Sequence, residues 1–146
     1  QSVGCAVVIT EMRTGAREEP DAIGWRMGRS ILIECKASRA DFRRDAHKAP
    51  RRVNQGIGYS RYYMTTRGML AEHEVPNTWG LLEVDGDQVH VTKRSHPHPD
   101  YAYVDEMKIL MSAIRRIGQN PPPGVSVRFY SYKTKNRATL GFSEEL

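Results

Sequence analysis

Apolar runs separated by turn-forming residues fill the first part of the chain and predict strands. Residues 3–12 are apolar and β-branched, residues 21–27 repeat that character after a polar turn, and residues 31–36 form a nearly continuous apolar run that ends in charge. A short continuous run bounded by turn residues is typical of a strand buried on both faces. We therefore expect consecutive strands that form a meander.

A basic helix is expected after this meander. Ser38-Arg39-Ala40-Asp41 has the spacing of a capping box, in which a hydroxyl and a carboxylate bind the unpaired amides at a helix start. The helix should cover residues 39–49, because Pro50 disfavours its continuation. Its apolar side is thin, so most of its charged surface should face outward.

The rest of the chain predicts further strands and a second helix. Residues 59–66 have strand character, and residues 80–84 and 88–92 flank Asp85-Gly86, a pair that suits the type I′ turn of a hairpin. A last strand is expected at residues 125–132. Helical spacing over residues 104–118 predicts a helix that buries one apolar stripe against the sheet, formed by Met107, Leu110, Met111, Ile114 and Ile117.

A chain of 146 residues can bury one continuous core, so we expect a single domain over residues 1–146. Its core should lie at about residues 3–92, with the helix and strand of residues 100–132 added to it. The apolar runs are far too short to cross a bilayer, and we expect no membrane partner and no signal peptide. Cys5 and Cys35 lie in apolar stretches where a small thiol packs well, which predicts a reducing, cytoplasmic compartment without disulfides.

The formal net charge of +5 is concentrated in one segment. Residues 37–68 hold eight basic residues, most of them arginines, against two acidic ones. Arginine matches phosphate oxygens with two parallel hydrogen bonds, so a polyanionic partner is expected, although a solvated helix face is the simpler interpretation. Arg43, Arg44, Arg51 and Arg52 are the expected phosphate contacts, and Tyr62 is the expected stacking partner of an unpaired base.

Two carboxylates and an ammonium are predicted to converge on one face of the sheet. Glu34 and Lys36 alternate with Cys35, so their side chains project from the same face of one strand. Asp21 begins the preceding strand, and a suitable hairpin register would place it beside that face. Two close carboxylates repel one another unless a divalent cation lies between them, which favours Mg²⁺ or Mn²⁺. Asp21, Glu34 and Lys36 are therefore the predicted catalytic residues.

The expected chemistry is phosphodiester hydrolysis. The metal would polarise a phosphodiester oxygen and activate a bound water, while Lys36 would orient that water or stabilise the charge at phosphorus. Further metal ligands would be the backbone carbonyl of Cys35, whose side chain should pack on the opposite face, and, more weakly, Glu11. A strand-end carboxylate that faces water is the simpler interpretation of Glu11. His96-Pro97-His98-Pro99 lacks a partner ligand at compatible spacing, and we expect it to be a rigid, exposed loop.

These residues also match a known pattern. Pro20-Asp21 precedes Glu34-Cys35-Lys36, and Glu34 follows Asp21 by thirteen positions at the end of an apolar run. This arrangement resembles the PD-(D/E)XK nuclease superfamily, and the strings at residues 20–25 and 33–42 look like its MmcB-like DNA-repair branch and related phage or prophage proteins. The resemblance implies an α/β fold with a restriction-endonuclease-like α-β-β-β-α-β core, whose mixed sheet is flanked by helices, with an added hairpin and a C-terminal helix.

The resemblance further implies a metal-dependent deoxyribonuclease in DNA repair, recombination or phage DNA processing, with DNA as its partner. A fold does not guarantee activity. Many members add an acidic residue from a helix before the first strand, and this chain begins too late to show such a helix. A DNA-binding module that has lost turnover therefore stays open as an alternative, as does an interaction subunit of a repair complex. A homodimer is also compatible with the sequence.

Overall fold

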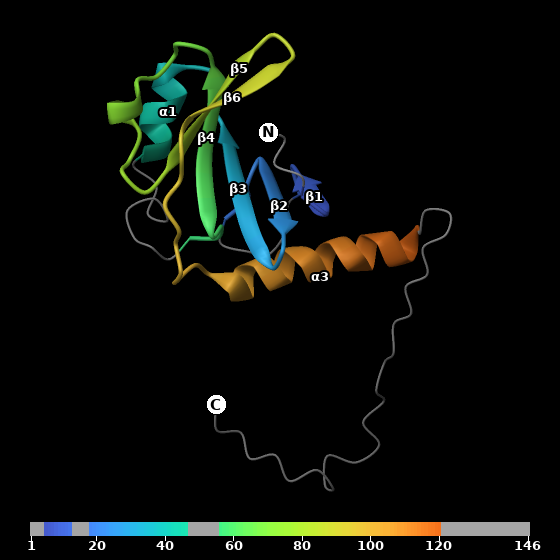
Figure 1. The fold of residues 1–146 in the computed structure, drawn as a ribbon. Coiled ribbons are helices and arrows are strands. Elements are labelled where there is room, and N and C mark those ends of the chain that lie inside the picture. Colours follow the sequence, from blue (N-terminus) through green and yellow to red (C-terminus); the bar gives the residue numbers. More distant parts are fainter. Residues whose placement is uncertain (1–4, 13–17, 47–55, 121–146) are drawn as a thin grey trace, which may run out of the picture. The chain divides into compact units, whose positions relative to one another are not determined.

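A computed structural model of the chain describes residues 5–12, 18–46 and 56–120. The described strands are β1 (Val7–Thr10), β2 (Ala22–Arg26), β3 (Arg29–Cys35), β4 (Ser60–Thr66), β5 (Gly80–Asp85) and β6 (Gln88–Lys93). The described helices are α1 (Arg39–Ala46), the short 3-10 helix η1 (Glu72–Glu74) and α3 (Tyr103–Gln119). Each strand and helix expected within these residues is therefore present, with shifted ends (Figure 1).

The strands form one mixed sheet in the order β1-β2-β3-β4-β5-β6. β1, β2 and β3 pair antiparallel as the expected meander, β3, β4 and β5 pair parallel, and β5 and β6 close the sheet as an antiparallel hairpin. The parallel step from β3 to β4 requires a crossover connection, and α1 lies in it. The predicted α/β class with a mixed sheet is confirmed, and from the first strand onward the elements follow the β-β-β-α-β order of the expected core.

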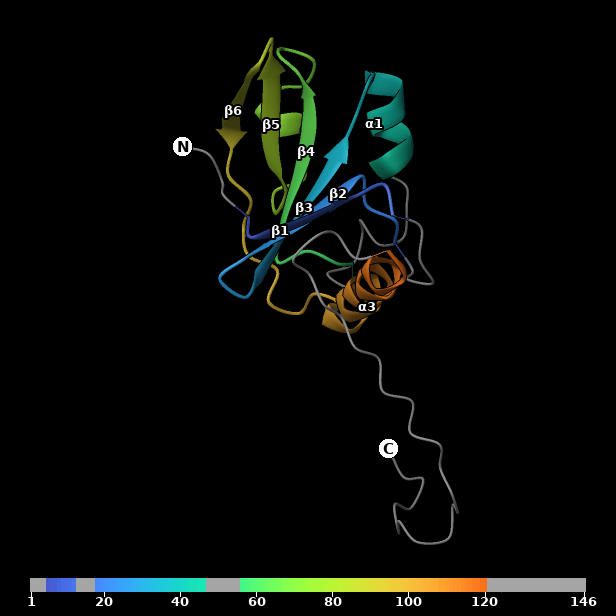
Figure 2. The same ribbon diagram turned by 90° about the vertical axis from the view of Figure 1, so that its right-hand side faces the viewer.

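One face of this sheet carries the core. Leu32 of β3, Tyr63 of β4 and Leu81 of β5 pack in one buried cluster with Phe42 of α1 and Ile109 of α3. Both helices therefore cover the same face, and Figure 2 shows them on one side of the sheet. The prediction that β3 is buried on both faces is wrong for the described residues: Leu32 is fully buried, whereas Ile31 and Ile33 on the other face are half-buried.

The helix α3 contacts the sheet through a different side from the one predicted. Its buried residues are Asp105, Glu106 and Ile109. The Glu106 carboxylate accepts hydrogen bonds from Ser30 Oγ at 2.7 Å, Gly58 N at 2.7 Å and Trp25 Nε1 at 3.1 Å. The predicted apolar stripe is instead largely exposed, with Met107 at 52%, Met111 at 45%, Ile114 at 40% and Ile117 at 39%. A bound carboxylate, rather than the apolar stripe, fixes which side of α3 faces inward.

Two loop predictions also need correction. The β5–β6 hairpin is present, but Gly86, with φ of 57°, is followed by Asp87 without a positive φ, whereas a type I′ turn needs both. Glycine at the first central position is the pattern of a type II′ turn. In the loop after β6, His98 is buried with 3% exposed; its backbone N–H donates to the Tyr59 carbonyl at 2.8 Å, and its ring Nε2 lies 3.2 Å from the Thr78 carbonyl.

The chain divides into two compact units, residues 1–113 and residues 114–146. Residues 121–146 lie outside the described residues, as does the strand expected at residues 125–132, so the single domain over residues 1–146 stays a prediction. The expected continuation of α1 over residues 47–49 also lies outside them. Within the described parts of the chain, no helix has the length and apolar character needed to cross a membrane.

Candidate active site

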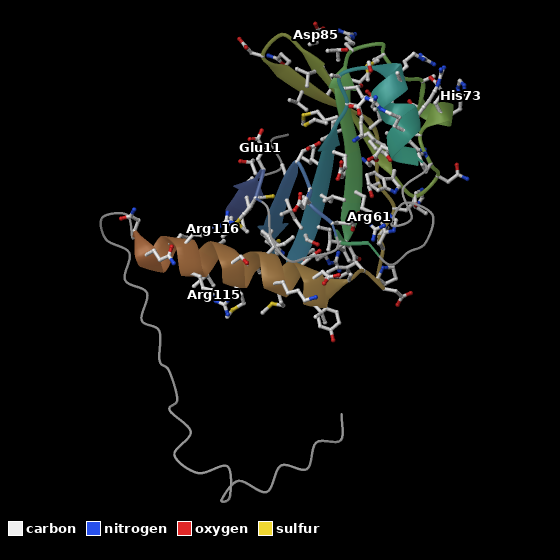
Figure 3. All side chains as sticks on the ribbon, turned by 180° about the vertical axis from the view of Figure 1, so that it is seen from behind. Glu11, Arg61, His73, Asp85, Arg115 and Arg116 are labelled. Carbon is white, nitrogen blue, oxygen red and sulfur yellow. The ribbon has the colours of Figure 1, made fainter. Side chains whose placement is uncertain are left out.

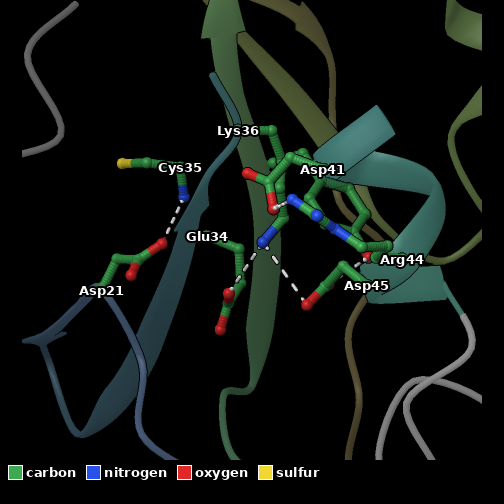
Figure 4. Close-up of polar contacts among 8 residues, drawn as sticks. Asp21, Glu34, Cys35, Lys36, Asp41, Arg44 and Asp45 are labelled. Carbon is green, nitrogen blue, oxygen red and sulfur yellow. Dashed lines mark hydrogen bonds and ion pairs between the residues drawn. The ribbon is translucent and has the colours of Figure 1, made fainter. Parts of the chain in front are cut away.

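The hairpin of β2 and β3 places Asp21 and Glu34 at the same end of the sheet. Ala22 pairs with Ile33, so Asp21, one residue before Ala22, lies beside Glu34, one residue after Ile33. The backbone N–H of Cys35 donates a 2.7 Å hydrogen bond to Asp21 Oδ2 (Figure 4). The structure thus brings the Asp21 carboxylate against the peptide that follows Glu34, and the convergence of both carboxylates on one metal ion stays a prediction.

Glu34 and Lys36 share the core-side face of β3. Strand alternation puts both on this face, where they are only 4% and 6% exposed, and the Lys36 ammonium lies 3.3 Å from Glu34 Oε2. A buried ion pair needs additional polar partners, because its mutual attraction alone rarely offsets the loss of hydration. The surroundings of Lys36 supply such a partner.

That partner is Asp45 of α1, which was not among the predicted site residues. Asp45 is 1% exposed; its Oδ1 lies 3.4 Å from the Lys36 ammonium, and its Oδ2 accepts a 3.0 Å hydrogen bond from the Tyr63 hydroxyl. We call Glu34, Lys36, Asp45 and Tyr63 the Lys36 cluster. Its position in the sequence could have revealed it: Asp45 is three residues after Phe42, the buried apolar residue of α1, so both side chains lie on the inward side of the helix.

Aromatic rings surround the Lys36 cluster on its core side. The Tyr63 ring stacks on Trp79 with centroids 4.4 Å apart and meets the edge of Phe42 at 5.0 Å. The Lys36 ammonium lies 5.8 Å from the centroid of the Tyr63 ring, at the outer limit of a cation–π contact. Because these rings exclude water, charges in the Lys36 cluster interact more strongly than they would at the surface.

The donor atoms at this end of the hairpin fit a hard divalent cation. Mg²⁺ takes oxygen ligands, retains several waters and is commonly held by one or two carboxylates together with substrate phosphate. Asp21 and Glu34 supply two carboxylates on either side of the Glu34–Cys35 peptide. Among residues 5–12, 18–46 and 56–120, no group of three or more His, Cys, Asp or Glu side chains is close enough to hold a metal by itself. Asp21 and Glu34 would thus be the protein ligands, with water and phosphate completing the shell.

The weaker ligand candidates lie at the margin of this site. Glu11 follows β1 with an exposed side chain and a φ of 49°, and its backbone N–H donates to the Asp21 carbonyl at 3.0 Å (Figure 3). Its described contact is with the backbone of Asp21, and the participation of the Cys35 carbonyl stays a prediction. The Cys35 side chain does point away from Glu34 and Lys36, but it is exposed rather than packed, because no described helix covers the other face of the sheet.

The predicted nucleic-acid contacts are only partly brought together. Arg43 and Arg44 are exposed on α1, the helix that also carries Asp45, and Arg44 lies 3.6 Å from Asp41. Arg51 and Arg52 lie outside the described residues.

Tyr62 lies on the opposite face of the sheet from Glu34 and Lys36. It pairs with Ile33 in the sheet and lines a pocket of about 190 Å³ on the opposite face, together with Ile31 and Ile33. Its ring covers Gly80, where a β-carbon would come within 2.3 Å of it. Because neighbouring strand residues face opposite sides, Tyr63 rather than Tyr62 contacts Lys36 and Asp45, and the stacking of Tyr62 on an unpaired base stays a prediction.

Comparison with known proteins supports the fold. The chain is similar to a solved structure described as the SPO1766 protein of unknown function from Silicibacter pomeroyi, with 23% sequence identity, a TM-score of 0.58, and coverage of 83% of this chain and 84% of that chain. No family model and no curated protein matches the chain. At this identity the likeness shows a shared α/β fold that extends over most of both chains.

Proposed function

We propose that this protein is a metal-dependent deoxyribonuclease that hydrolyses phosphodiester bonds. The observation that carries the proposal is the placement of Asp21, Glu34 and Lys36 at one end of the β2–β3 hairpin, with Asp21 bound to the Cys35 amide and Lys36 paired with Glu34. Two carboxylates on adjacent strand ends can hold a metal that assists phosphodiester hydrolysis, and a neighbouring ammonium can stabilise the charge that develops in the reaction.

Each residue has a defined task in this proposal. Asp21 and Glu34 would hold Mg²⁺ or Mn²⁺, which supplies Lewis-acid polarisation of a phosphodiester oxygen and a more acidic bound water when it is present. Lys36 would place a positive charge beside the phosphate and stabilise the negative charge that develops on the phosphoryl oxygens. The aromatic rings around Tyr63 limit the water near Lys36, so its charge is less screened than that of a surface lysine.

DNA is the proposed substrate because α1 carries exposed arginines next to its site residue. The start of α1 is fixed by Ser38, whose Oγ accepts a 3.2 Å hydrogen bond from the Asp41 backbone N–H. Arg43 and Arg44 follow in the same helix. Guanidinium groups bind backbone phosphates without reading sequence. We further propose a role in DNA repair, recombination or phage DNA processing in a reducing, cytoplasmic compartment, which agrees with the free thiols of Cys5 and Cys35.

A second candidate function is an interaction subunit with the same fold. The exposed apolar side of α3, which includes Met107 and Met111, favours it, because single-chain proteins seldom leave such a stripe on one helix in water. An inactive DNA-binding module would be a third outcome of the same experiment, since it would bind DNA equally well in chelator.

The deciding experiment is a cleavage assay on supercoiled, linear and single-stranded DNA with Mg²⁺, Mn²⁺ or chelator. Wild type should cut only with metal, and Asp21→Asn should reduce cutting by at least about 100-fold, because the metal that stabilises the transition-state charge would lose one of its two carboxylate ligands. Asp87→Asn is the matched control: it makes the same chemical change in the exposed β5–β6 turn and should leave cutting unchanged. Equal cutting by Asp21→Asn and wild type would refute the proposal.

A further inference from the structure

We propose that Asp45 is a positioning residue that keeps Lys36 in the active site when a divalent cation occupies Glu34. The inference rests on the proposed function and adds a residue to it. It arises from one juxtaposition: the Lys36 ammonium lies between two buried carboxylates, 3.3 Å from Glu34 on its own strand and 3.4 Å from Asp45 on α1.

Glu34 cannot serve both cations equally. Without metal, its carboxylate neutralises Lys36. A divalent cation bound to the same carboxylate repels the ammonium, and the repulsion is strong because both charges lie in a site with little water. Lys36 therefore needs a second counterion to remain beside the reacting phosphate.

Asp45 satisfies that need, and the charges of the described groups then balance. Asp21 and Glu34 together compensate one divalent cation, while Asp45 compensates Lys36. An unpaired buried charge is strongly destabilising, so removal of either member of the second pair disturbs the first. In this arrangement Lys36 exchanges Glu34 for Asp45 as its main partner, with no change in the backbone.

The contacts of Asp45 fit a positioning role better than a metal-binding one. Its two carboxylate oxygens face different partners, Oδ1 toward Lys36 and Oδ2 toward the Tyr63 hydroxyl. Tyr63 is itself held by stacking on Trp79 and by the edge of Phe42. Asp45 thus presents one oxygen to Lys36 in a fixed orientation, and it does not belong to any described group of three possible metal ligands.

The test is a double-mutant cycle on Mn²⁺ affinity, measured by calorimetry on the full chain without DNA. Asp45→Asn should weaken Mn²⁺ binding by about tenfold, because Lys36 then stays on Glu34 and competes with the metal. In a Lys36→Met background the same substitution should change affinity by less than about threefold, because the competing ammonium is gone. Asp41→Asn, on the same helix but partly exposed, is the matched control and should leave affinity unchanged.

Each other outcome has a definite meaning. An equal loss in both backgrounds would show that Asp45 acts on the metal or on the fold directly, and would overturn the inference. So would an unchanged affinity in Asp45→Asn. If wild type binds no Mn²⁺, the proposed function fails instead.

Tyr63→Phe keeps the test decisive if Asp45→Asn does not fold. This variant removes only the hydroxyl that orients Asp45. It should weaken Mn²⁺ binding by about threefold with Lys36 present and should have no effect with Lys36→Met. A loss that is the same in both backgrounds would again overturn the inference. In cleavage assays Asp45→Asn should lower kcat while leaving KM for DNA unchanged, since Asp45 contacts no substrate group.

Discussion

The burial of His98 makes the free energy of unfolding depend on pH. Burial, followed by the nearby charge of Arg61, lowers the pKa of His98 below its usual range, although the Thr78 carbonyl 3.2 Å from Nε2 opposes the shift. In the unfolded chain the same imidazole titrates at about pH 6.5. As pH falls below that value the unfolded state binds the proton first, so the free energy of unfolding decreases until the folded-state pKa is reached.

The prediction is that His98→Gln removes part of this pH dependence. Urea unfolding of wild type at about pH 7.5 and about pH 5.5 should show lower stability at the acidic pH, and the difference should shrink in the variant, because Gln carries no titrating group. All other residues are the same in both proteins, so their contributions cancel in the comparison. A variant whose stability falls as steeply as that of wild type would assign the dependence to other groups.

The residues of the candidate site differ in how far their positions could be predicted from their neighbours in the sequence. Glu34 and Lys36 share a face because side chains alternate along a strand, which was predictable from the sequence. The register that sets Asp21 beside Glu34 was only a condition of the prediction, and the β2–β3 pairing supplies it. Asp45 was not predicted, because its contact with Lys36 depends on how α1 packs on the sheet. Cys35 was placed on the correct face, but its exposure depends on what covers that face, which strand periodicity does not encode.

At the scale of elements, α3 is fixed to the sheet by a buried carboxylate. Glu106 accepts hydrogen bonds from Trp25, Ser30 and Gly58, which belong to β2, β3 and the segment before β4. Helical periodicity predicted that a helix would form here, and it does. The periodicity assigned the wrong inward side, because the spacing of apolar residues does not reveal a carboxylate whose hydrogen-bond donors come from three distant segments.

We predict that Glu106→Ala lowers the free energy of unfolding by about 3 kcal/mol, since it leaves buried donors without an acceptor. Glu106→Gln keeps one carbonyl oxygen and should cost about 1 kcal/mol. Urea unfolding measures both, and Arg115→Ala, which truncates an exposed side chain on the same helix, should change stability by less than about 0.5 kcal/mol. Equal stability of Glu106→Ala and wild type would show that α3 is held by other contacts.

At the scale of the whole molecule, the formal net charge of +5 determines how the protein meets a polyanion. A net charge attracts nucleic acid from any direction, whereas contacts with phosphates release counterions and make affinity depend on salt. Arg43 and Arg44 stand out because they are exposed on the helix that also carries Asp45. If α1 contacts DNA, their loss should matter more than the loss of the same charge elsewhere.

The corresponding variant is Arg43→Ala with Arg44→Ala, compared with Arg67→Ala and Arg94→Ala, an exposed pair that changes the net charge equally. DNA affinity, measured in chelator over a range of salt concentrations, should fall in the first variant, and the slope of log affinity against log salt should decrease by about 2, close to one unit for each lost phosphate contact. The control should shift affinity slightly and leave the slope unchanged. Equal slopes in both variants would mean that α1 acts only through net charge, and would contradict the proposal that Arg43 and Arg44 contact phosphates.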